Sequence, residues 1–265
     1  MTAPAWPIVR PFGAVRQFFC PLVVPYGDLP ADRVNLDDFY SGSVDKNPVD
    51  KIYCKRGGFI PPFEFNPREF NFNMLQMEDT DANQTLSLLK VKEAMVDAGM
   101  NPSGDVKKNC GCILGIGGGQ KSSHEFYSRL NYVVVEKVLR GMGATEEDVQ
   151  VAVAKYKAHF PEWRLDSFPG FLGNVVSGRC ANVFNLDGMN CVVDAACASS
   201  LVSIKMAMEE LMTGDVRSMV AGACCHPDCS VKRAVRVALA GGEACERTVE
   251  GEWVMFACTS KEGTL

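Results

Sequence analysis

The most constraining feature of this sequence is a short apolar run that leads directly into an amphipathic helix. Residues 191–196 (CVVDAA) have the pattern of a buried strand. Residues 197–213 (CASSLVSIKMAMEELMT) have helical periodicity, and Gly214 follows as the C-terminal cap. The apolar face predicted for this helix is formed by Leu201, Ile204, Met208 and Leu211. Cys197 therefore lies in a sharp turn between a strand and a helix.

Further strand and helix patterns occur between residues 80 and 223. We expect helices from residue 80 to Gly99, from residue 122 to Gly141 and over residues 145–158, with strands over residues 109–116 and 217–223. A capping box of Ser122 and Glu125 marks the start of the second helix, whose apolar face would contain Phe126, Leu130, Val133 and Val134. Strands that alternate with helices through short links indicate a largely parallel α/β sheet.

Composition excludes several classes of protein. Hydrophobic residues are 47% of the chain and charged residues 22%, as in an ordinary folded protein. No apolar run is long enough to span a membrane, and a net charge of −5 disfavours a nucleic-acid partner. Without an export signal we expect a cytoplasmic protein. Arg10 and Arg16, in an initial stretch without acids, leave organellar targeting open.

The chain has 12 cysteines, which we interpret mainly as buried, reduced thiols. The cluster of Cys224, Cys225, His226 and Cys229 lacks a second Cys/His pair at zinc-site spacing. We therefore expect no metal.

The position of Cys197 favours a reactive thiolate. A thiol at the start of a helix meets unpaired backbone N–H groups and the positive end of the helix dipole. The neighbouring Ala196, Ala198 and Ser199 are small, so a substrate carbonyl can approach and the amide of Cys197 can donate to an oxyanion. We predict Cys197 as a catalytic nucleophile, with these three neighbours in the vicinity of the substrate and oxyanion.

Residues 193–201 (VDAACASSL) resemble the active-site motif of β-ketoacyl synthases. The match is closest to the ketosynthase domains of polyketide-type polyunsaturated fatty acid synthases, and it extends over residues 34–225. The segments that carry it are residues 50–59 (DKIYCKRGGF), 117–122 (GGGQKS), 161–174 (PEWRLDSFPGFLGN) and 184–190 (FNLDGMN).

This resemblance implies a thiolase-like α/β fold, of which the chain would form the N-terminal half of the α-β-α-β-α layered ketosynthase fold. It also implies an acyltransferase. Cys197 would take an acyl group from the phosphopantetheine of an acyl carrier protein, and decarboxylative Claisen condensation with a malonyl group would follow. No bound cofactor is implied. The expected partners are the carrier protein and either a second copy, paired through residues 191–196, or a complementing C-terminal half.

The resemblance ends near residue 225. We divide the chain into an irregular N-terminal arm (1–33), a ketosynthase half (34–225) and a divergent tail (226–265). The family's two histidines and lysine for decarboxylation belong to the other half, and we expect His124, His159 and His226 to be structural or exposed. Condensation by this chain alone would therefore be incomplete.

Three other interpretations remain open from the residues alone. Residues 115–122 (GIGGGQKS) resemble a phosphate-binding loop, but Gln120 replaces the glycine required before the lysine. A cysteine hydrolase would need an acid and a histidine well beyond the nucleophile. The third is a non-catalytic or partner-dependent scaffold, which acylation of Cys197 would distinguish from an enzyme.

Overall fold

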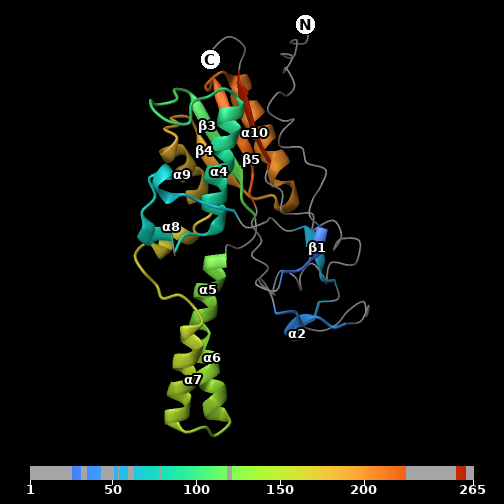
Figure 1. The fold of residues 1–265 in the computed structure, drawn as a ribbon, viewed down its shortest axis with the longest axis vertical. Helices are drawn as coiled ribbons and strands as arrows, with labels where there is room; N and C mark the ends of the chain where they lie inside the picture. The colour runs from blue at the N-terminus through green and yellow to red at the C-terminus, as the bar shows by residue number, and fades with distance from the viewer. Residues whose placement is uncertain are drawn as a thin grey trace.

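The computed structural model describes residues 26–30, 35–42, 51–52, 54–58, 63–77, 79–117, 121–224 and 255–260. Its centre is a four-stranded sheet with strand order β4-β3-β5-β6 (Figure 1). Strand β3 is parallel to both β4 and β5, whereas β6 is antiparallel to β5. The bounds are β3 Cys110–Gly115, β4 Asn190–Val193, β5 Ser218–Ala223 and β6 Met255–Ser260.

The two central strands are buried along their whole length, as expected for parallel strands covered on both faces. Their positions confirm the strands predicted over residues 109–116 and 217–223. Strand β4 is shorter than predicted and only half-buried, because in the described part of the chain it has a neighbouring strand on one side alone. The parallel pairing confirms the α/β class.

Helices cover both faces of the sheet and make three layers. Helix α10 (Ser199–Thr213) packs on one face, where Ile113 meets Ala207 and Met219. Helices α4 (Ala82–Asp97) and α9 (Val175–Val183) cover the other face, where Leu114 lies in their shared core. Neighbouring residues of β3 thus contact opposite layers, as the alternation of side chains along a strand requires.

Helix α10 buries only part of the face that its periodicity predicts, because Ile204 and Leu211 pack against the core and the other two residues do not. Leu201 is 64% exposed and Met208 42% exposed, whereas Ser203 and Ala207 are buried. Small side chains let the helix axis approach the glycine-containing strands closely, and the larger side chains are left at the margins of the contact. The predicted helix end is confirmed, since Gly214 adopts a left-handed conformation with φ 90°.

The helix predicted from residue 80 begins slightly later, with Asp81 as its cap. The Asp81 carboxylate accepts a hydrogen bond from the amide of Asn83 at 2.9 Å. Gly99, with φ 75°, follows the last turn as predicted.

A helical arm extends away from the sheet (Figure 1). The single helix predicted over residues 122–141 is two helices, α5 (Lys121–Leu130) and α6 (Tyr132–Gly141), and Ser122 lies inside α5 instead of capping it. Helix α7 (Glu146–Ala158) packs against α6. The start predicted for α7 is confirmed, because the Thr145 hydroxyl accepts from the amide of Asp148 at 3.2 Å.

The predicted apolar face of residues 122–141 is largely exposed. Phe126 is buried, but Leu130 is 63% exposed and Val134 is 58% exposed. Val133 is also exposed, so this part of the prediction is wrong. The reason is that α7 packs against one side of α6 and leaves its other side uncovered.

The remaining elements are short. Strands β1 (Tyr26–Asp28) and β2 (Arg56–Gly58) pair antiparallel, so residues 26–28 of the predicted irregular arm form a strand. The others are α2 Leu36–Phe39, η1 Pro67–Phe70, α3 Met74–Met77 and α8 Ser167–Phe171. Of the divergent tail, the described residues 255–260 form β6. No helix among the described residues has the length and apolarity needed to cross a membrane.

Candidate active site

The predicted nucleophile lies in a tight connection at the carboxyl end of the sheet. Strand β4 ends at Val193, the 3-10 turn η2 covers Ala196–Ala198, and α10 begins at Ser199. The backbone of Cys197 therefore lies in η2, just before the α-helix predicted to begin with it. The side chain of Cys197 lies outside the described part of the molecule.

The turn has an unusual backbone conformation at the residue before Cys197. Ala196 has φ 49°, in the left-handed region. This conformation costs an L-residue about 1–2 kcal/mol relative to the right-handed one. Sequence reasoning anticipated a sharp turn of small residues but not which residue would take this conformation. Because no glycine occurs between β4 and α10, a residue with a side chain has to take this conformation, but the sequence does not indicate which one.

Hydrogen bonds from both ends of the turn hold Ala196. The Asp194 carboxylate accepts from the amide of Ala196 at 2.9 Å. The Ser199 hydroxyl accepts from the amide of Ala195 at 2.9 Å and donates to the carbonyl of Ala196 at 2.8 Å. At about 0.5–1.5 kcal/mol each, these bonds are sufficient to offset the backbone cost of the turn.

Glycines of the neighbouring strand make room for the turn. A Cβ atom at Gly115 would lie 2.6 Å from the Cβ of Ser199, and one at Gly117 would lie 3.1 Å from a carboxylate oxygen of Asp194. These glycines therefore allow β3 to approach the start of α10. The Asp194 carboxylate beside Gly117 would repel a phosphate, which disfavours the phosphate-loop interpretation.

The turn has an open side and a closed side. Ala196 and Ala198 are exposed, so the backbone of this turn can be reached from solvent. Ser199 is 3% exposed and lies beneath the turn. Of the residues predicted around Cys197, the two alanines thus face outward and the serine faces inward.

Comparison with known proteins identifies the family to which this site belongs. The profile described as "Beta-ketoacyl synthase, N-terminal domain" matches residues 25–240. The chain belongs to the β-ketoacyl synthase family. The predicted resemblance to this family is thereby confirmed, and the match extends beyond residues 34–225 at both ends.

Curated relatives of this ketosynthase chain are much longer proteins. A polyunsaturated fatty acid synthase polypeptide of Thraustochytrium sp. is 69% identical over 198 residues, which are 75% of this chain and 7% of the relative. Polyketide synthase PksL of Bacillus subtilis is 28% identical over 196 residues, which are 74% of this chain and 4% of the relative.

Solved structures share the thiolase-like ketosynthase fold. The oxazolomycin ketosynthase domain OzmH KS7 of Streptomyces albus superposes with a TM-score of 0.57 at 22% identity, over 81% of this chain and 32% of that one. The PfaC keto synthase-chain length factor gives a TM-score of 0.57 at 24% identity, over 75% of this chain and 21% of that one. At these identities the likeness concerns the fold alone.

Three other thiols in the described part of the ketosynthase chain are poorer nucleophiles than an ordinary cysteine. Burial raises the pKa of Cys110 and of Cys180 above the ordinary value for a thiol. Burial, and secondarily the nearby Glu210 carboxylate, also raise the pKa of Cys191 on β4. A raised pKa lowers the thiolate fraction of these cysteines and so reduces their reactivity toward thioesters.

The remaining candidate ligands and bases are only partly described. Cys224 is buried in the core beneath α4 and α9, while Cys225, His226 and Cys229 lie outside the described residues. No group of three metal-ligating side chains occurs among the residues described. His159 is exposed at the end of α7, where its Nδ1 lies 2.8 Å from the carbonyl oxygen of Lys155.

Proposed function

We propose that this chain forms the nucleophile-bearing half of a ketosynthase and that Cys197 accepts an acyl group from an acyl carrier protein. The observation that carries the proposal is the left-handed turn at Ala196, which places Cys197 between the end of β4 and the start of α10. Family membership supplies the reaction class. The phosphopantetheine arm of the carrier delivers the substrate, and no bound cofactor takes part.

The first step is thioester exchange. The Cys197 thiolate attacks the carbonyl carbon of the acyl thioester, and the carbonyl oxygen becomes an oxyanion. When this intermediate collapses, the bond to the phosphopantetheine sulfur breaks and that thiolate leaves and takes up a proton. Backbone N–H groups at the start of a helix stabilise both the attacking thiolate and the oxyanion.

Condensation is the second step of the proposed reaction. Loss of carbon dioxide from a malonyl thioester gives an enolate carbon, which attacks the acyl-Cys197 carbonyl and releases the Cys197 thiolate. The product is a 3-oxoacyl thioester two carbons longer. Groups that stabilise the enolate would come from a C-terminal ketosynthase half, so acyl transfer is the step assigned to this chain.

Strand β4 is the proposed contact for a second copy. It lies at the edge of the sheet in the described part of the chain, and Cys191, Val192 and Val193 are half-buried. An edge strand has free backbone groups that can pair with another strand. The similarity of this chain to condensing enzymes disfavours the alternative interpretation, that it is a non-catalytic scaffold.

Mass spectrometry of the full chain tests acyl transfer. After incubation with hexanoyl acyl carrier protein, we expect the wild type to gain one hexanoyl group and Cys197→Ala to gain none. Cys54→Ala, which removes another incompletely buried thiol, is the matched control and should acylate like the wild type. A folded wild type that gains no acyl group contradicts the proposed function.

A further inference from the structure

The hydroxyl of Ser199 connects two residues of the nucleophile turn. It accepts from the amide of Ala195 at 2.9 Å and donates to the carbonyl of Ala196 at 2.8 Å. The side chain is 3% exposed, beneath the turn. An acyl group arriving from solvent therefore meets the turn and not this hydroxyl.

The conformation of Ala196 controls where Cys197 is presented. Cys197 is the next residue in the chain, so any rotation about the Ala196 backbone moves the Cys197 backbone directly. An alanine favours right-handed or extended conformations over φ 49°. The turn therefore keeps its shape only while its hydrogen bonds hold Ala196.

We propose that Ser199 is a positioning residue, whose hydroxyl fixes Ala196 in the left-handed conformation and so sets the attack geometry of Cys197. The inference rests on the proposed acyl transfer to Cys197. Asp194 acts in the same way from the other side of the turn, since its carboxylate accepts from the amide of Ala196 at 2.9 Å.

The same helix contains a matched control. Ser203 is fully buried one turn further along α10, and its hydroxyl oxygen lies 2.8 Å from the carbonyl oxygens of both Ser200 and Gly222, which share its one proton as acceptors. Replacing it by alanine also deletes a buried hydroxyl that bonds to backbone carbonyl groups. The contact with Gly222 joins α10 to β5, and neither contact involves Ala195 or Ala196.

The experiment measures the rate at which Cys197 of the full chain is acylated by hexanoyl acyl carrier protein, read on the Cys197 peptide by mass spectrometry. We expect Ser199→Ala to slow acylation by about tenfold or more, because small displacements of a reacting group reduce rates steeply. Ser203→Ala should stay within about twofold of the wild type, since it leaves the turn intact.

A second substitution tests the mechanism. Glycine adopts positive φ without the cost that alanine meets, so Ser199→Ala should slow acylation much less in an Ala196→Gly background. Asp194→Ala should also slow acylation of Cys197, and Ala196→Gly should again reduce this effect. Because Asp194 is exposed, this variant keeps the test available if Ser199→Ala does not fold.

The proposal is overturned if Ser199→Ala acylates like Ser203→Ala, or if Ala196→Gly gives no rescue. Should the wild type take no acyl group, the proposed function fails separately. The rate of Cys197 alkylation by iodoacetamide in the same variants then decides the positioning role. A decrease for Ser199→Ala that Ala196→Gly reverses supports it, and equal rates in all variants exclude it.

Discussion

Strand β3 and helix α6 both contain large apolar side chains, but the strand buries all of them while the helix exposes several. Ile113 and Leu114 are fully buried, whereas Val134 and Val138 are 58% and 54% exposed. The strand lies between two helical layers, and the helix contacts one neighbour in an arm that extends from the sheet (Figure 1). The surrounding layers therefore decide how much an apolar residue contributes to stability.

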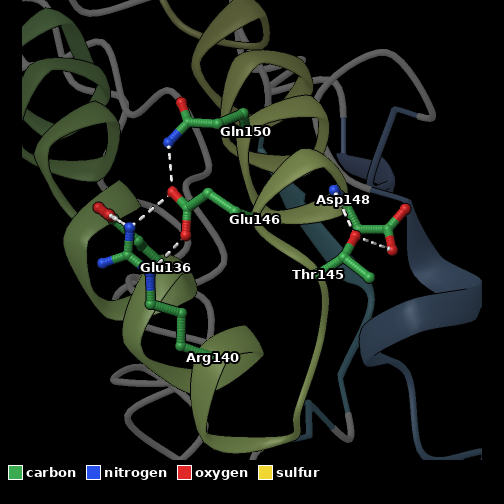
Figure 2. A network of polar contacts seen from close by, with 6 residues as sticks. All are labelled: Glu136, Arg140, Thr145, Glu146, Asp148 and Gln150. Carbon is green, nitrogen blue, oxygen red and sulfur yellow. Dashed lines mark hydrogen bonds and ion pairs between the residues drawn. The ribbon is translucent and has the colours of Figure 1, made fainter.

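The two regions also differ in their polar contacts. At the nucleophile turn, the buried Ser199 hydroxyl bonds to backbone groups. At the tip of the arm, Arg140 pairs with Glu136 and Glu146, each at 2.8 Å, and Gln150 donates to Glu146 at 3.0 Å (Figure 2). These exposed ion pairs are screened by water and contribute little to overall stability.

Truncation of one apolar residue in each region should give the largest contrast. Ile113→Ala leaves a cavity between β3 and α10 and should destabilise the protein by about 2–5 kcal/mol. Val134→Ala removes an exposed side chain and should change stability by no more than about 0.5 kcal/mol. Urea unfolding of both variants measures the difference. Equal losses would mean that the exposed face of α6 is covered in solution.

Replacing one glycine by alanine in each region should change the stability by an intermediate amount, with a loss in the sheet and a gain in the arm. At Gly115 the new Cβ would lie 2.6 Å from Ser199 and 2.9 Å from Ala223, so Gly115→Ala should cost about 1–3 kcal/mol. A Cβ atom added at Gly141 would have no contact within 4 Å, and Gly141→Ala should stabilise α6 by up to about 1 kcal/mol. Thermal unfolding midpoints should shift in opposite directions. A neutral Gly115→Ala would show that α10 can move away from β3.

The smallest effect should come from pH at the tip of the arm. The hydrogen bond from Arg140, with a further one from Gln150, lowers the pKa of Glu146 below its ordinary value. Its stabilising contribution is therefore complete above the ordinary carboxyl pKa and is lost as the pH falls through the lowered one. Amide exchange in α6 and α7, corrected for intrinsic rates, should be faster in Glu146→Gln than in the wild type at neutral pH. This difference in exchange rate should vanish in acid, where Glu146 is protonated. If it persists in acid, the effect of the substitution comes from packing and not from the charge of Glu146.

Much of the secondary structure could be predicted from local patterns. The six-residue strand β3, the cap at Thr145 and the end of α10 at Gly214 all follow from residues close in sequence. The capping box at Ser122 was wrong, because that residue lies within α5. The Ser-x-x-Glu pattern indicates that a helix starts nearby, but it does not fix the first helical residue.

The sequence by itself determined that the three parallel strands alternate with helices, that Cys197 lies between a strand and a helix, and that the chain resembles ketosynthases. These depend on periodicity and on a contiguous motif. The tertiary structure decided which faces are buried, that β4 lies at an edge of the described sheet, and that Ala196 takes the left-handed conformation. The first two depend on residues distant in the chain, whereas the turn at Ala196 combines local hydrogen bonds from Asp194 and Ser199 with packing against β3. The close approach of Gly115 to Ser199 is one such contact, since only packing brings β3 against the start of α10.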